Sequence, residues 1–240
     1  MSRDLIEMRK ELAAIFAGNA ALKQAVREVS KLDIIKGCLI ARIPKHQDIN
    51  ISSILAGELQ KDVSIGDYMF IQNGDALVKV AYNNLKLGNS VNPHMLVESY
   101  RILAEDPEGT YRRTNPVVYS LNHVPPEFEN IENRLAGSFR QVYAGNLEDD
   151  IVARAMYMYN AIVDVWPFDE FNGEIAVFAM NYYLMENGFM PIDMPMNKGE
   201  FDELIGACLK GIRPNEEYEF FKNAIAEKMA GTIEACKRMI

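Results

Sequence analysis

Two apolar segments separated by a short polar loop constrain the fold of this chain more than any other feature. The first segment, residues 147–165, has apolar side chains at helical spacing, and its helix must end at Trp166 because the following proline disfavours helical backbone before it. The second segment, residues 174–187, ends at Gly188, a residue type that commonly terminates helices. We therefore predict two adjacent buried helices. The free N–H groups of the second helix point into the loop, where they suit an anion.

Helical periodicity also dominates the rest of the chain. The other predicted helices span residues 5–16, 20–39, 50–60, 75–87, 93–104, 126–142, 201–211 and 215–238. Segment 109–124 differs, because it holds strand-forming residues broken by Asn115-Pro116, and it predicts a short β-hairpin. Since no repeat or low-complexity linker interrupts the pattern, we predict an all-α fold with one small hairpin and an N-terminal helical extension.

Composition and charge exclude several classes of protein. No run of eighteen or more apolar residues occurs, and the first ten residues mix charged and apolar side chains, so neither a membrane helix nor a secretory signal is expected. The three cysteines, Cys38, Cys208 and Cys236, lie far apart, which favours reduced buried thiols over disulfides. A net charge of −9 argues against binding to duplex nucleic acid. We expect an acidic cytoplasmic protein.

The loop between the two apolar segments reads Trp166-Pro-Phe-Asp-Glu-Phe-Asn-Gly-Glu174. It resembles the signature of the Fic family, His-Pro-Phe-x-(Asp/Glu)-Gly-Asn-Gly-Arg, which has a second Arg where this chain has Val177. Five of the nine loop positions agree. The helix after the loop also follows the family pattern, at Asn181, Leu184, Gly188, Pro191 and Ile192.

Two upstream segments extend the resemblance, which runs in order from Ile51 to Pro195. Gly109-Thr-Tyr-Arg112 and the hairpin after it are similar to the lead-in and the target-docking flap of the family. Ser52-Ser-Ile-Leu-Ala-Gly-Glu58 resembles the inhibitory helix that precedes many Fic domains. The resemblance implies flap positions at Val117, Val118 and Tyr119 and inhibitory-helix positions at Ser52, Ala56 and Gly57.

The same resemblance implies a fold and a domain organisation. The expected fold class is an all-α helical bundle of the Fic/Doc type with a small β-hairpin flap. The expected N-terminal extension spans residues 1–60 and includes the segment similar to the inhibitory helix. A Fic-like domain with C-terminal helices is expected at residues 61–240.

Fic proteins transfer AMP from ATP to target hydroxyl groups, and the resemblance assigns a role to each loop position. Trp166 occupies the position of the general base, and Glu170 occupies the position of the Mg²⁺ ligand. The residues equivalent to the nucleotide-binding loop are Phe168, Glu170, Asn172, Gly173, Glu174 and Val177. Glu174 and Val177 stand where the family has its two phosphate-binding arginines.

These departures remove the groups on which the reaction depends. The indole of Trp166 donates a hydrogen bond but cannot accept a proton, and Phe171 replaces a glycine beside the phosphates. No Lys, Arg or His occurs between Arg154 and Lys198, so the loop is predicted to be acidic. The inhibitory glutamate is replaced as well, by Ala56, which matches the loss of its arginine partner at Val177.

Several interpretations of single residues stay open. Trp166 and Phe168 are read as a core plug, Glu174 as an ordinary first-turn acid, and Glu170 as either a solvated carboxylate or a metal ligand. His123 is the one histidine expected near the loop. Arg112 and Arg113 are the basic residues expected nearest to the site, and a solvated surface role is favoured for both.

We favour a binding or regulatory pseudoenzyme, with no cofactor and with a protein partner docked through the flap. An acidic loop beneath the flap would suit a basic partner segment. The alternative is an active nucleotide- or phospho-donor transferase with an altered, metal-assisted mechanism, which would use Mg-ATP. A third possibility is a dimeric partner that holds an active homologue in check. The oligomeric state is open, and neither nucleic acid nor membrane is expected as a partner.

Overall fold

The computed structural model describes residues 4–43, 48–144, 150–194, 196–209 and 214–240. The described part of the chain is mainly helical, as the periodicity predicts. The helices are α1 (Leu5–Gly18), α2 (Ala20–Leu39), α3 (Ile51–Leu55), α4 (Ile65–Lys86), α5 (Pro93–Ala104), α6 (Ile131–Tyr143), α7 (Ile151–Val165), α8 (Asn172–Glu186), α9 (Lys198–Leu209) and α10 (Pro214–Met239). Two short 3₁₀ helices, η2 (Tyr119–Leu121) and η3 (Phe128–Asn130), lie between α5 and α6.

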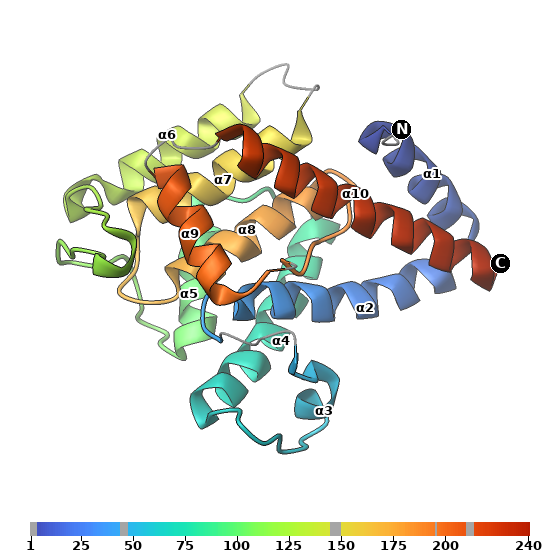
Figure 1. The fold of residues 1–240 in the computed structure, drawn as a ribbon, viewed down its shortest axis with the longest axis horizontal. Helices are drawn as coiled ribbons and strands as arrows, with labels where there is room; N and C mark the ends of the chain where they lie inside the picture. Colours follow the sequence, from blue (N-terminus) through green and yellow to red (C-terminus); the bar gives the residue numbers. More distant parts are fainter. Residues whose placement is uncertain (1–3, 44–47, 145–149, 195, 210–213) are drawn as a thin grey trace.

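The two apolar segments form α7 and α8, which pack side by side at the centre of the molecule (Figure 1). Every residue of α8 from Asn172 to Leu184 is buried. It is surrounded by α2, α4, α5 and α7, which explains why its apolar residues cover the whole circumference instead of one stripe.

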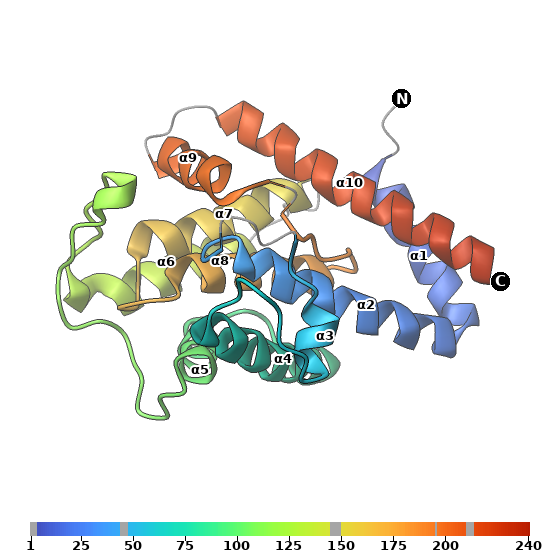
Figure 2. The same ribbon diagram turned by 60° about the horizontal axis from the view of Figure 1, so that its bottom comes forward.

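The N-terminal helices belong to the same hydrophobic core as the rest of the chain. Helix α2 packs on α8, and α1 packs on the long α10, which crosses one side of the molecule (Figure 2). Both chain ends therefore lie on the same side of the molecule (Figure 1). The predicted N-terminal extension is helical, but its packing joins it to the domain that follows.

Side-chain caps begin several of the predicted helices. Asn92 accepts a hydrogen bond from the N–H of Met95, and Asp150 accepts one from Ala153, so α5 and α7 start with filled caps. Three predicted boundaries were wrong by five residues or more. Helix α6 begins at Ile131 instead of residue 126, because the 3₁₀ helix η3 precedes it. Helix α4 begins ten residues before residue 75, because Ser64 caps it and its early side chains reach the core. Helix α3 ends at Leu55, because Gly57 adopts a positive φ of 88°.

The predicted hairpin is reduced to one antiparallel bridge, between Val118 and His123. The N–H of each residue donates to the carbonyl of the other, at 2.9 and 3.2 Å. Longer pairing does not form, because the turn between them is the 3₁₀ helix η2 and Asn122 adopts a positive φ of 49°. The preceding Pro116 also has no N–H to donate.

The cysteines and the length of the apolar helices were both predicted from composition. Cys38 and Cys236 are free and buried, as predicted, and the side chain of Cys208 lies outside the described part of the chain. Among the described residues, no helix combines the length and the apolar character needed to cross a membrane.

Candidate functional site

The loop between α7 and α8 has unusual backbone at both of its ends. Trp166, which follows α7, has a φ of 48°, and Phe171, which precedes α8, has a φ of 61°. Left-handed backbone costs a non-glycine residue roughly 1–2 kcal/mol. Phe171 stands at the position where the Fic signature has glycine, so the loop uses a glycine-like conformation there although the glycine itself is absent.

Aromatic rings fill the interior of the loop. Phe168 is completely buried and lies parallel to Tyr100, with 4.6 Å between the ring centroids. Phe171 is half-buried, and its ring centroid lies 6.1 Å from that of Phe70 on α4. Trp166 is half-buried as well. The predicted core plug is therefore confirmed for Phe168, whereas Trp166 keeps part of its surface in solvent.

Asn172 and Gly173 hold the loop closed. The side-chain amide of Asn172 donates to the carbonyl of Phe168 at 2.8 Å and accepts from the N–H of the same residue at 2.9 Å. A Cβ atom on Gly173 would lie 3.0 Å from the Cβ of Ala41, so this glycine permits close packing at the end of α2. Both residues have structural tasks that require no nucleotide.

Glu174 is buried at the start of α8, with a carboxylate oxygen 3.6 Å from a guanidinium nitrogen of Arg42. Burial raises the pKa of this carboxyl, while its own backbone N–H, Arg42 and Lys198 oppose the shift. Glu174 is a first-turn acid of α8, as predicted, and the structure adds that it is buried. Its carboxylate takes the place at the helix N-terminus where an external anion would bind.

Arg42 is the residue near the loop that the sequence analysis missed. It follows α2 and lies over the rings of Phe70 and Phe171, at 5.0 and 5.1 Å from their centroids, and it is 3.5 Å from Asp67. The residues of the loop are acidic, as predicted, but the cation that pairs with Glu174 comes from a distant part of the sequence. The sequence near the loop carries no signal that could have identified Arg42.

The remaining carboxylates of the loop, Asp169 and Glu170, are exposed. Within the described residues, no three His, Cys, Asp or Glu side chains gather as a metal site would require. A metal at Glu170 would thus take its other ligands from phosphate and water, and the role of Glu170 as a ligand stays a prediction.

The positions expected for the inhibitory helix lie on α3 and directly after its end. Helix α3 packs on α2 and α4 and, in the described part of the chain, not on α8. Ser52, Ala56 and Gly57 are exposed. Val177 is completely buried, and a Cβ on Gly37 of α2 would lie 3.4 Å from its side chain. The arrangement gives no support for a contact between Ala56 and Val177.

Arg112 lies against the loop, as expected, but it is almost completely buried, so its expected place on the surface was wrong. Its guanidinium donates to the carbonyls of Trp166 and Pro126 at 2.8 and 2.6 Å, and also to those of Thr114 and Val165 and to the side chain of Asn115. Its backbone N–H donates to the carbonyl of Pro167 at 2.9 Å. This single side chain therefore ties the loop to the flap segment.

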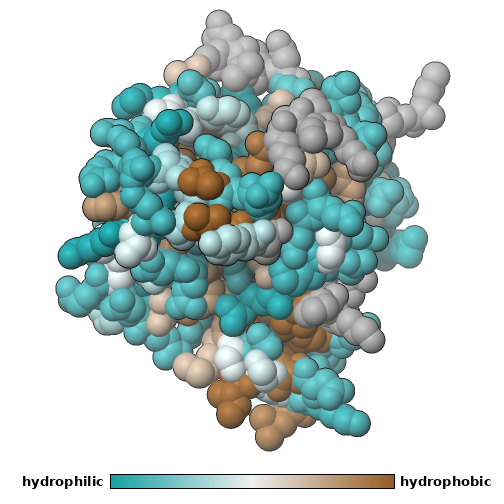
Figure 3. Space-filling view, turned by 60° about the vertical axis from the view of Figure 1, so that its left-hand side comes forward, coloured by the Kyte–Doolittle hydropathy of each residue, from teal (hydrophilic) through white to brown (hydrophobic). Residues whose placement is uncertain are grey.

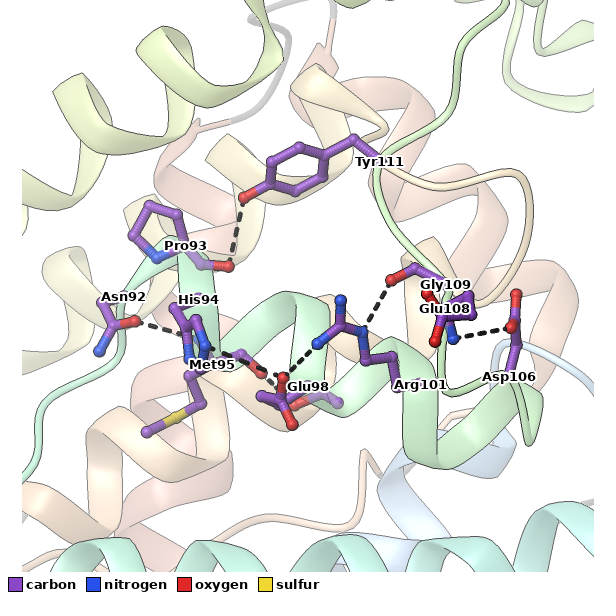
Figure 4. Close-up of polar contacts among 11 residues, drawn as sticks. Asn92, Pro93, His94, Met95, Glu98, Arg101, Asp106, Glu108, Gly109 and Tyr111 are labelled. Carbon is purple, nitrogen blue, oxygen red and sulfur yellow. Dashed lines mark hydrogen bonds and ion pairs between the residues drawn. The ribbon is translucent and has the colours of Figure 1, made fainter.

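The segment before the flap is fastened to α5 (Figure 4). The hydroxyl of Tyr111 donates to the carbonyl of Pro93 at 3.2 Å, and Arg101 donates to the carbonyl of Gly109 at 2.8 Å. Arg101 also pairs with Glu98 on the same helix, at 2.7 Å. These contacts position the start of the flap beside the rings that fill the loop.

The flap itself presents apolar side chains to solvent. Val117, Tyr119 and Val124 are exposed, whereas Val118 is buried and η2 packs on α9. On this side of the molecule, hydrophobic residues stand out from a mainly hydrophilic surface (Figure 3). A ring nitrogen of His123 lies 2.8 Å from the carbonyl oxygen of Asp164, so that nitrogen carries its proton and donates it to the backbone. That nitrogen is therefore not free to act as a base.

Comparison with known proteins agrees with the geometry. Residues 90–184, from just before α5 to α8, match the model of the Fic/DOC family. A search of curated proteins found no match.

Solved structures share the fold at low sequence identity. A Fic domain containing signaling protein from Bacteroides thetaiotaomicron has a TM-score of 0.75 at 15% identity, with 97% of this chain and 96% of that chain covered. Residues 134–508 of Fic-1 from C. elegans have a TM-score of 0.68 at 18% identity, with 98% and 72% covered. A Fic family protein from Desulfovibrio desulfuricans has a TM-score of 0.68 at 12% identity, with 98% and 75% covered.

Proposed function

We propose that this chain, which belongs to the Fic/DOC family, is a binding or regulatory protein that does not transfer AMP. The observation that carries the proposal is the buried Glu174 at the start of α8, paired with Arg42. A nucleotide phosphate would need that helix end to be free and a cation to be available there.

The charges near the loop oppose phosphate binding. Two negative charges about 4 Å apart repel by roughly 4 kcal/mol at an intermediate dielectric, whereas a helix N-terminus stabilises an anion by only about 0.3–1 kcal/mol. Arg42 already faces two carboxylates, those of Glu174 and Asp67. Trp166 cannot accept a proton from a target hydroxyl, so a bound nucleotide would still lack its base.

The flap is the surface through which we propose that a protein partner docks. Val117, Tyr119 and Val124 offer exposed apolar side chains. The flap is paired through one bridge, so its edge offers few backbone N–H and C=O groups to a partner strand. Contacts between side chains would therefore supply much of the binding energy. Replacing Tyr119 by proline should weaken such binding, whereas Ile65→Ser, at an equally exposed apolar site on α4, should leave it unchanged.

Trp166 provides the test of the proposal, because it is the only tryptophan and lies in the loop. Its fluorescence should stay constant when Mg-ATP or Mn-ATP is added up to millimolar concentration, and calorimetry should detect no binding heat. Saturable binding in the micromolar range would contradict the proposal. If Glu170→Gln then abolished that binding, the metal-assisted transferase would be the better description.

A further inference from the structure

A groove with a volume of about 930 Å³ lies at the end of α8 that faces away from the loop. It is bounded by α1, α2, the end of α4 and the segment from Met185 to Pro191. Since α8 has 15 residues and rises by about 1.5 Å per residue, the groove and the loop lie on the order of 20 Å apart. The groove is thus separate from the loop and the flap.

The floor of this groove is apolar. Leu12 and Phe189 are buried, and Phe16, Leu85 and Met185 are half-buried at its surface. Apolar side chains of a ligand that bind to this floor are removed from water, which stabilises the complex by about 25 cal/mol per Å² of apolar surface buried.

The rim of the groove is basic, although the whole chain has a net charge of −9. Among the described residues, five cationic side chains line it: Arg9, Lys10, Lys23, Arg27 and Lys86. In the same part of the chain, one carboxylate lines it, that of Glu186, which already accepts hydrogen bonds from the hydroxyls of Ser90 and Tyr143. The groove therefore has a strong local excess of positive charge.

In the described part of the chain, these five cations form no ion pair with an acidic side chain, whereas several other lysines do. Lys31, Lys228 and Lys237 lie 2.6–2.8 Å from Asp75, Asp33 and Glu11, respectively. Arg9 lies over the ring of Phe189, at 5.8 Å from its centroid, and also contacts the carbonyl of Asn187 at 3.5 Å. Arg27 lies over Tyr82 at the same distance of 5.8 Å. Both guanidinium groups are held in place by these rings but keep donors for an external acceptor.

We propose that this groove binds an acidic, amphipathic segment of a partner protein. The apolar floor would take the hydrophobic side chains of the segment, and the five cations on the rim would pair with its carboxylates. A nucleic acid fits less well, because its charge density requires an extended basic surface and the chain as a whole is negative. A small inorganic anion would leave the apolar floor without a partner.

Fluorescence anisotropy with a labelled synthetic peptide tests the proposal. The probe is a twelve-residue peptide with Leu at helical spacing and Glu at the other positions, and it is compared with the same peptide carrying Gln in place of Glu. We expect the acidic peptide to bind at least about tenfold more tightly than its neutral counterpart and to weaken as salt is added.

A double variant in the groove and a control double variant outside it locate the site. Arg9→Glu with Arg27→Glu should weaken peptide binding at least about tenfold. Arg134→Glu with Arg140→Glu changes the same charge at exposed positions of α6 and should leave binding within about twofold. Circular dichroism checks that both variants stay folded.

Three results would overturn the proposal. The first is the absence of peptide binding, and the second is an equal loss in both variants. The third is binding of a twelve-nucleotide single strand or of tripolyphosphate that is as tight as that of the peptide and depends on Arg9 and Arg27, since it would assign the groove to those anions instead. None of these results depends on whether the loop binds ATP.

Discussion

The two ends of α8 use charge in opposite ways. At its N-terminal end, the carboxylate of Glu174 is buried against Arg42, and aromatic rings and Asn172 close the loop. At its C-terminal end, the described residues that line an open groove include five cations and the carboxylate of Glu186, which accepts hydrogen bonds from hydroxyl groups. The net charge of the chain therefore describes neither site. At the N-terminal end, Glu174 is paired with Arg42 inside the protein, whereas the cations at the C-terminal end are left without carboxylate partners in the described part of the chain.

Among these variants, the largest change in stability is expected at Arg112, whose guanidinium donates hydrogen bonds to the backbone at the N-terminal end of the loop. Arg112→Ala should lower the free energy of unfolding by roughly 4 kcal/mol, because several buried carbonyls would lose a charged donor. Arg113→Ala, at the exposed neighbour, should change it by less than about 0.5 kcal/mol. Chemical denaturation measures both. Similar losses in the two variants would show that the loop does not depend on this side chain.

A smaller effect is expected at the ion pair that closes the N-terminal end. Arg42→Ala should lower the free energy of unfolding by about 2 kcal/mol at pH 8, because Glu174 would be left buried without its cation. The loss should be smaller near pH 4.5, where the carboxyl of Glu174 is increasingly protonated. Thermal or chemical unfolding at both pH values gives the comparison.

The variant Glu174→Gln is the control for this pH dependence. Burial raises the pKa of Glu174 above its ordinary value of 4.5, so between the two values the folded protein binds more protons than the unfolded chain. The contribution of this group therefore falls as pH rises from about 4.5. Glutamine carries no charge at any pH, so Glu174→Gln should gain stability relative to the native chain as pH increases. A constant difference across pH would contradict the assignment.

The smallest effect on stability is expected in the groove. Lys10, Lys23 and Lys86 are exposed and form no ion pair with described residues. Changing any of them to Gln should move the unfolding midpoint by less than about 2 °C, as measured by calorimetry. A clear loss of stability would mean that the groove cations support the fold, and the contrast between the two ends of α8 would then weaken.

Most of the fold could be predicted from the sequence, because helix boundaries depend on local chemistry. Asn92 and Asp150 cap helices from their own side chains, and Gly188, with a φ of 80°, follows the end of α8 as expected. The start of α4 was missed because packing in the core outweighs the low helix propensity of Gly66 and Gly74. The hairpin was overestimated because η2 replaces extended backbone.

The candidate site could be predicted only in part. The loop between α7 and α8 and its differences from the Fic signature at Trp166 and Glu174 can be read directly from the sequence. The burial of Arg112 and the presence of Arg42 beside Glu174 are not, because each depends on contacts between segments that are distant along the chain. Local patterns report on backbone hydrogen bonds and capping within a few residues, and they carry little information about such pairs.

The order of the helices, the resemblance to the Fic family and the differences from its signature at Trp166, Glu174 and Val177 all follow from the sequence. Tertiary structure alone decided how charge is distributed around α8. It brought Arg42 to Glu174 at one end and gathered five cations from α1, α2 and α4 at the other. The reason is physical: the energy of a charge depends on its burial and on its neighbours in space, and folding sets both.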